Sequence, residues 1–271
     1  MSQQTENKTA LLIYALVPIA LLISAEGLFY VLRVQLSPSR FFALFGCAVL
    51  LAQGILQLIF LKGEICPGQR GRLSNVGLYL GLYWIMVLVL CFFKPFVPQT
   101  WQAIAGLLLL FSTFQQPKDP QLRRAILLFG VVAGVIGLLC YVLLLYRLDY
   151  MMWLVLSPFN QAIIALGLAY YLLQLSRSRL ANFIQLLPMA MLLMLIGNAL
   201  FCVLMFAWVY ATDVPVRLNL GLIALYFALH LLVALLLIRS RIRKKAGEKM
   251  QSAVEIASAL VMPLLLIGAG M

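Results

Sequence analysis

Five side chains that could do chemistry lie inside long apolar stretches of this 271-residue sequence: Glu26, Gln53, Gln57, Asn198 and His230. Polar and ionisable groups are costly at bilayer depth, so we treat these five as a candidate intramembrane polar site. Glu26 is expected roughly 9 Å below the outer end of its helix, at 1.5 Å per residue. It could accept a proton or orient a ligand. Alternatively, it could be a structural partner for Arg33 or for a Gln or Tyr of a neighbouring helix.

The other four residues also have a structural alternative. Gln53 and Gln57 are four residues apart and share one face of a helix, where amides can hold helices together. Asn198 and His230 are each expected near the middle of a helix. His230 is the one His of the chain, and a lone His is more often hydrogen-bonded within the packing than a ligand.

Several chemistries are excluded by what the sequence lacks. One His cannot supply both axial ligands of a bis-His haem. No H-E-x-x-H, G-x-S-x-G or paired-Asp motif occurs, and His and carboxylates are too few for a metal cage. We therefore expect no catalytic residue, no metal, and no haem or covalently bound cofactor, while a bound quinone stays open. Any enzymatic role is at most that of a quinol-contacting subunit of an oxidoreductase.

The composition assigns the chain to the membrane. Hydrophobic residues make up 65% of it and charged residues 10%, whereas soluble domains are about half apolar and a quarter charged. A soluble enzyme, a disordered chain and a nucleic-acid-binding module are excluded, despite the net charge of +12. About 20 apolar residues cross a bilayer, so the length allows roughly nine spans. The lipid bilayer is thus the first partner. The sequence predicts an all-α transmembrane bundle with helices near 9–32, 41–61, 75–93, 99–114, 125–146, 150–175, 181–211, 218–238 and 251–270.

The basic residues predict the orientation. With nine spans, most of the 20 Lys and Arg fall on one side of the membrane, and the positive-inside rule makes that side cytoplasmic. We expect a cytoplasmic N-terminus and an outside C-terminus, in a bacterial inner membrane. Several of these cations could instead dock a partner or anionic lipid, and these candidates are Arg70, Arg72, Arg177, Arg179, Arg241, Arg243, Lys244 and Lys245.

Three short matches recur in the same order and predict an internal duplication. Leu36-Ser-Pro38 returns as Leu156-Ser-Pro158, Arg70-Gly-Arg72-Leu-Ser-Asn75 as Arg177-Ser-Arg179-Leu-Ala-Asn182, and Val97-Pro98 as Val214-Pro215. Two four-helix copies in the same orientation would be related by an axis along the membrane normal. The alternative is that helix starts and cytoplasmic loops favour such residues. The expected units are a tail 1–8, repeat 1 at 9–114, repeat 2 at 125–238, a basic loop 239–250 and a C-terminal helix 251–271.

Residues 119–190 carry a family resemblance. They contain Asp119-Pro-Gln-Leu-Arg123, Tyr150-Met-Met-Trp153, Leu156-Ser-Pro158 and Leu187-Pro188. In this layout the chain resembles the haem-free membrane anchor subunits of dimethyl-sulfoxide-reductase and polysulfide-reductase (NrfD-like) type molybdoenzymes. The resemblance implies two four-helix bundles, contact with a quinol, and docking of an iron–sulfur or molybdoenzyme partner. The quinol-linked His that the sulfoxide-reductase anchors carry after their second helix has no counterpart in residues 61–64, which read Leu-Lys-Gly-Glu.

Three functions are open at this point. The first is the redox anchor just described. The second is a small-solute or lipid transporter whose site lies between the two halves, with Glu26, Asn198 and His230 lining one cavity. The third is a membrane scaffold or sensor whose basic loops bind another membrane-protein subunit.

Overall fold

The computed structural model describes residues 2–32, 43–63, 65–114, 116–148, 150–211, 219–242 and 249–270. Side chains are described for 12–31, 43–63, 65–114, 116–148, 152–211, 219–239 and 253–266. Every regular element in these ranges is a helix. The helices are α1 (Ser2–Leu32), α2 (Gly46–Lys62), α3 (Pro67–Gly77), α4 (Leu80–Phe93), α5 (Val97–Phe114), α6 (Pro120–Tyr146), α7 (Tyr150–Val155), α8 (Pro158–Leu175), α9 (Ala181–Ala211), α10 (Leu220–Ile242) and α11 (Lys249–Gly270).

The expected all-helical bundle of about nine spans is confirmed. Within the described residues, six apolar stretches are long enough to cross a membrane, and two of them, Pro67–Phe93 and Met152–Leu175, each contain two helices in series. Shorter apolar helices occupy Gly46–Lys62 and Ala253–Leu266, and α5 adds a helix of 18 residues. Residues 67–74, expected in a loop, belong to α3 instead, because Pro67 at the first helical position starts a helix that runs almost directly into α4.

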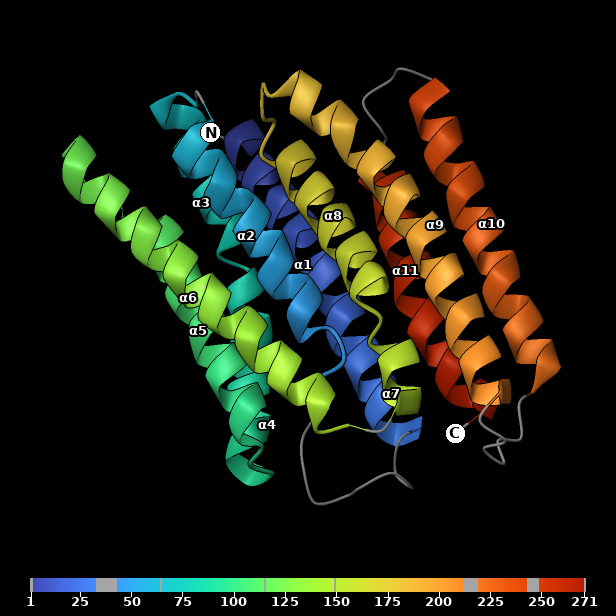
Figure 1. Ribbon diagram of the computed structural model, residues 1–271. Helices are drawn as coiled ribbons and strands as arrows, with labels where there is room; N and C mark the ends of the chain where they lie inside the picture. The colour runs from blue at the N-terminus through green and yellow to red at the C-terminus, as the bar shows by residue number, and fades with distance from the viewer. Residues whose placement is uncertain are drawn as a thin grey trace.

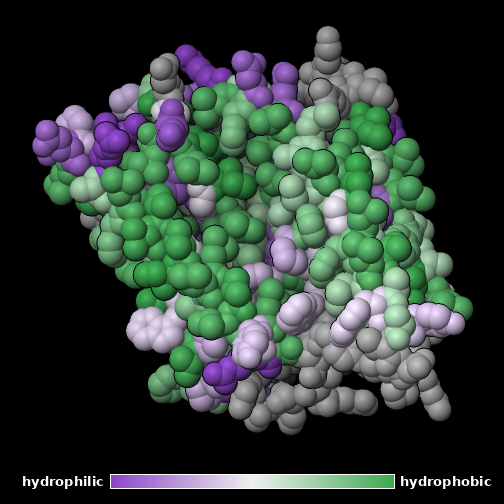
Figure 2. Space-filling model, in the orientation of Figure 1, coloured by the Kyte–Doolittle hydropathy of each residue, from purple (hydrophilic) through white to green (hydrophobic). Residues whose placement is uncertain are grey.

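The two ends of the bundle are both polar but differ in the number of basic residues (Figures 1 and 2). The N- and C-termini lie at opposite ends, and an apolar band lies between the polar ends. We call the end that holds the start of α3, the start of α6 and the α8–α9 connection the basic end. Its described cations include Lys62, Arg70, Arg72, Lys118, Arg123, Arg124, Arg177, Arg179 and Arg239. Fewer described cations, Lys94 and Arg147, follow the helices that finish at the opposite end. This uneven distribution is the feature on which the positive-inside rule depends.

The helices form two groups that meet along α2 and α8. One group holds α2, α4, α5 and α6, and the other holds α8, α9, α10 and α11, with α1 packed on α4, α8 and α11. Helix α6, assigned by sequence to repeat 2, packs against α5 and α2, while α11 packs in a similar way against α10 and α8. The repeat boundary between residues 114 and 125 stays a prediction, and the spatial grouping divides the chain after α6.

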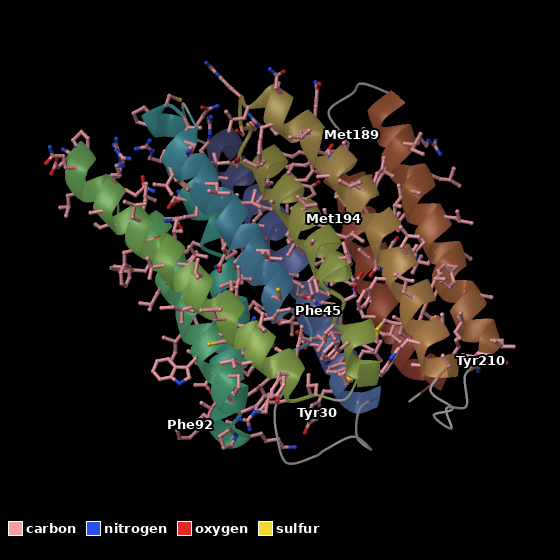
Figure 3. All side chains as sticks on the ribbon, viewed as in Figure 1. Tyr30, Phe45, Phe92, Met189, Met194 and Tyr210 are labelled. Carbon is pink, nitrogen blue, oxygen red and sulfur yellow. The ribbon has the colours of Figure 1, made fainter. Side chains whose placement is uncertain are left out.

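The start of α2 lies inside the bundle rather than at its edge. Figure 3 shows Phe45 among the helices, whereas Tyr30, Phe92 and Tyr210 lie toward the end opposite the basic end. Phe45 is fully buried, and Phe92 and Tyr210 are exposed. Residues 43–45, directly before α2, are therefore non-helical at a depth where lipid offers no hydrogen bonds, so the protein itself must supply them.

Glycine allows one close approach between α4 and α5. A Cβ atom built on Gly106 of α5 would lie 2.2 Å from Cε2 of Trp84, a fully buried ring of α4. A real Cβ cannot approach a ring so closely, so the two helices would have to move apart. Gly54 of α2 provides a contrast, because nothing lies within 4 Å of its built Cβ.

We expect Gly106→Ala to lower the apparent Tm of the detergent-purified protein, because overpacking costs about 1–3 kcal/mol. Gly54→Ala is the matched control. It should leave Tm unchanged or raise it, since Ala is favoured over Gly in helices by up to about 1 kcal/mol. Equal effects of the two substitutions on thermal unfolding would contradict this packing of α4 on α5.

Candidate functional site

Glu26 joins α1 to the start of α2. Its carboxylate accepts hydrogen bonds from the backbone N–H groups of Leu44 (2.9 Å) and Phe45 (2.8 Å), and from the Tyr83 hydroxyl (2.7 Å). The side chain is 4% exposed. Phe45 precedes the first residue of α2 and makes no cap of its own, so a carboxylate from another helix satisfies donors there and complements the helix dipole. This geometry fits the structural alternative of a Tyr partner, and a further role for Glu26 stays a prediction. Arg33 lies outside the described residues.

Two glutamines that the sequence analysis missed complete this cap. The Gln99 Oε1 atom accepts from the Ala43 backbone N–H at 3.2 Å, and its Nε2 donates to Gln102 Oε1 at 2.9 Å. Gly46 lets these amides come close, because a Cβ there would lie 3.0 Å from Gln102 Oε1. Both glutamines are buried. They belong to the first turns of α5, and their spacing of three places them on one helix face.

Gln161 links the two helix groups. Its Nε2 donates to the Leu44 carbonyl oxygen at 2.9 Å, and its Oε1 accepts from the Ala48 backbone N–H at 3.0 Å. One buried side chain of α8 thus binds both a free acceptor and a free donor at the start of α2. These two hydrogen bonds from one side chain to the start of a helix fix the register of α2 against α8.

The break between α7 and α8 places polar groups near this contact. Leu156 and Ser157 separate the two helices, and Pro158 opens α8. Ser157 is fully buried and Asn160 is 2% exposed. The Ser157 Oγ and both polar atoms of the Asn160 amide have no hydrogen-bond partner within the protein. Buried polar groups without partners are rare and indicate a bound water or ligand.

Gln53 and Gln57 connect helices within the first group. The Gln53 Oε1 accepts from the Trp84 Nε1–H at 3.0 Å. Gln57 Oε1 accepts from the Ser112 hydroxyl at 3.2 Å, and Gln57 Nε2 donates to the Leu127 carbonyl oxygen. These bonds tie α2 to α4, α5 and α6, which matches the reading of the pair as interhelical amides.

The structure brings Asn198 and His230 together between α9 and α10. Asn198 Nδ2 donates to the Tyr226 hydroxyl at 2.8 Å and lies 3.0 Å from His230 Nε2. His230 Nδ1 lies 3.0 Å from the Tyr226 carbonyl oxygen, which assigns the ring hydrogen to Nδ1 and makes Nε2 an acceptor. Asn198 Oδ1 is buried without a partner. The Tyr226 hydroxyl also lies 3.0 Å from the Cys202 sulfur.

The predicted polar residues fall into separate groups. Glu26 bonds to the start of α2 and to α4, whereas Asn198 and His230 bond to one another and to Tyr226 of α10. No hydrogen bond described here joins the two groups, so the single cavity shared by all three residues stays a prediction. Among the residues with described side chains, no group of three His, Cys, Asp or Glu is arranged to hold a metal ion.

The basic residues predicted to dock a partner or anionic lipid also lie in different places. Arg70 lines a pocket at the basic end, whereas Arg72, Arg177 and Arg179 are exposed there. Arg243, Lys244 and Lys245 lie outside the described residues, as does the side chain of Arg241.

Comparisons with known proteins agree with the membrane assignment. The profile of a family described as "integral membrane domain" matches residues 3–267. A protein of Haemophilus influenzae (strain Rd), named "Uncharacterized protein", is 28% identical over 271 residues, which cover 98% of this chain and 99% of the relative. No solved structure matches.

We expect Glu26→Ala to destabilise the protein strongly, because it leaves buried donors at Leu44, Phe45 and Tyr83 unsatisfied at about 1–3 kcal/mol each. Tyr83→Phe is the graded control, since it removes one donor together with its bond and should cost about 1 kcal/mol. Thermal unfolding in detergent measures both. A Tm for Glu26→Ala no lower than that of Tyr83→Phe would show that the carboxylate does not hold the start of α2.

Proposed function

We propose that the chain, which belongs to the integral membrane domain family, is a multi-pass transporter of a small polar solute, with its site between α2 and α8 near the break before α8. The buried, unpartnered Asn160 amide at the start of α8 carries this proposal. We place the chain in a bacterial inner membrane with its basic end in the cytoplasm, as the distribution of cations supports.

Interrupted helices support a site at this place. Short or Pro-interrupted hydrophobic segments in corresponding positions of two halves are a strong pointer to a transporter binding site. The two Leu-Ser-Pro matches precede α2 and α8, α2 has 17 residues, and the two helices pack together. Their first turns are joined by Gln161. Non-helical backbone at membrane depth is tolerated where protein or a water-filled cavity surrounds it.

The chemistry of the donors and acceptors indicates the kind of solute. Asn160, Ser157 and the Gln102 Nε2 group are buried and have polar atoms without partners. All are uncharged, and together they offer donors and acceptors. Glu26, the carboxylate at the start of α2, already accepts from three donors. The set therefore favours a neutral solute with several hydroxyl or amide groups over an ion.

We expect a polar metabolite to raise the Tm of the purified protein, because a ligand at about 100 times its Kd stabilises by about 2.7 kcal/mol. Asn160→Leu should abolish the Tm shift. Asn198→Leu is the matched control, a buried amide whose partners lie on α10, and it should keep the shift on a lower baseline. A screen of neutral metabolites without any shift, or a full shift in Asn160→Leu, would count against the proposal.

A haem-free, quinol-contacting anchor of a redox complex is the second candidate. The group around His230 supports it, because a neutral imidazole, a phenol and an amide lie together with the Tyr226 and His230 ring centroids 4.3 Å apart. The buried, unpartnered Asn198 Oδ1 could accept a hydrogen bond from a quinol hydroxyl. An iron–sulfur or molybdoenzyme subunit would dock at one end of the bundle.

If this second function holds, protein extracted in mild detergent should carry a quinone and an iron–sulfur partner. His230→Phe should then reduce the bound quinone at least tenfold, whereas Asn160→Leu should retain it. Chromatography of the extracted quinone and metal analysis of the eluate give the readouts. Preparations free of both quinone and partner would remove this candidate.

A further inference from the structure

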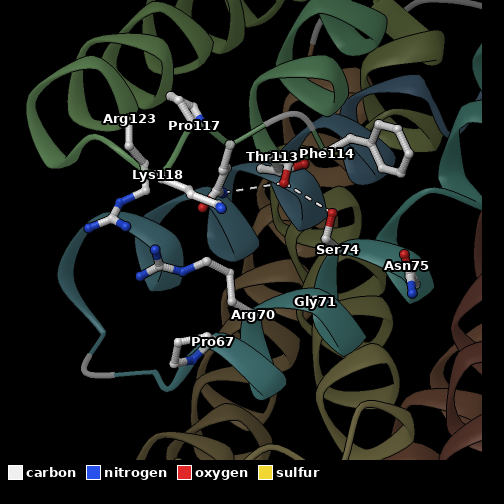
Figure 4. Close-up of a pocket in the computed structure, with 11 residues that line it drawn as sticks. Pro67, Arg70, Gly71, Ser74, Asn75, Thr113, Phe114, Pro117, Lys118 and Arg123 are labelled. Atoms are coloured by element: carbon white, nitrogen blue, oxygen red, sulfur yellow. Dashed lines mark hydrogen bonds between the residues drawn. The ribbon is translucent and has the colours of Figure 1, made fainter.

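A pocket lies at the basic end, away from the first turns of α2 and α8. It has a volume of about 440 Å³ and lies where α3, the end of α5 and the start of α6 meet (Figure 4). Pockets of this size hold small-molecule ligands or headgroups. Arg70 and Ser74 of the sequence motif 70–75 both line it.

Three cations from three segments line this pocket. Arg70 comes from α3, Lys118 from the α5–α6 connection and Arg123 from α6. Figure 4 shows the guanidinium groups of Arg70 and Arg123 on the same side of the pocket. No acidic side chain is among the described lining residues. Like charges brought together at a partly buried surface repel one another, so an anion bound here would be stabilised.

The nearest described carboxylate in the sequence has a different task. Asp119 follows Lys118 directly but does not line the pocket. Its Oδ1 and Oδ2 accept from the backbone N–H groups of Gln121 (3.2 Å) and Leu122 (3.3 Å), which caps the start of α6. Asp119 thus caps α6 and does not neutralise the cations that line the pocket.

The pocket lining also holds a hydrogen-bond donor without a partner. The Nε atom of Arg70 is buried and has no hydrogen-bond partner. Around it, the Ser74 hydroxyl and the Gln116 amide donate to one shared acceptor, the Thr113 carbonyl oxygen, at 3.0 and 3.3 Å. A guanidinium with a free Nε–H presents the planar fork that binds two oxygens of one oxyanion.

We propose that this pocket binds a phosphate group, either of a lipid headgroup or of a soluble phosphorylated compound. A phosphate offers oxygens in several directions, and therefore matches cations that arrive from three segments better than a planar carboxylate does. The position supports the same ligand, because lipid phosphates lie at the ends of membrane spans, and basic pockets between such helices bind anionic headgroups.

Two double variants of equal charge test the proposal. Arg70→Gln with Arg123→Gln removes two cations that line the pocket. Arg72→Gln with Arg124→Gln removes two exposed cations one or two residues away that do not line it. The lipid arm measures binding of short-chain phosphatidylglycerol to the delipidated full chain by native mass spectrometry. The soluble arm measures binding of inorganic phosphate and of glycerol 3-phosphate by calorimetry at constant ionic strength.

We expect saturable binding in one arm, which identifies the source of the phosphate. The pocket double variant should weaken it at least tenfold, and the exposed double variant by less than threefold. The pocket variant should also unfold at the same or a higher temperature than wild type in low-salt, phosphate-free buffer, since repulsion is relieved. Equal weakening by the two double variants, or no saturable binding of any of the three probes, would overturn the proposal.

Discussion

Lipid offers no hydrogen bonds, and this constraint explains most of the polar interior of the chain. Wherever backbone leaves the helical pattern at depth, a side chain from a distant helix must supply the missing partner. The start of α2 obtains such hydrogen-bond partners from three helices: Glu26 from α1, Gln99 from α5 and Gln161 from α8. Glu26, one of the five polar residues that look functional in the sequence, is thus occupied in holding one helix end. Buried polar groups that are left without partners within the protein, such as the Asn160 amide, are the ones that point to a ligand.

Fold class followed readily from the sequence, because a chain that is 65% hydrophobic with short polar interruptions has few ways to satisfy its backbone in lipid. The candidate site was only partly predictable. Burial of Glu26 beside a Tyr was among the alternatives, but Gln99, Gln102 and Gln161 were not considered. Depth was inferred from distance to helix ends, and that measure fails where a helix such as α2 begins inside the bundle. The pairing of α6 with α5 and α2 was similarly hidden, since no periodicity in a fully apolar helix specifies its neighbour.

The two proposed sites differ in character and lie in different parts of the bundle. The α2–α8 contact collects uncharged amides and a hydroxyl in a dry interior, and suits a neutral molecule. The pocket beside α3 collects cations at the membrane surface, and suits an anion. The Arg-x-Arg motif illustrates how a topology signal can acquire a second use. Its charges mark the basic end wherever they occur, but Arg70 alone among its four arginines lines the pocket.

The Gln161 bridge has a consequence for how the two helix groups could move. Separating α2 from α8 near their first turns would break the hydrogen bonds to Leu44 and Ala48 together. The Leu44 carbonyl and the Ala48 N–H would then have no hydrogen-bond partner. A rotation that pivots on this junction would keep both bonds. If the protein is the transporter proposed above, Gln161 would lie at the pivot between the two helix groups. A solute bound beside Gln161 would then move little while the far ends of the two groups change their separation.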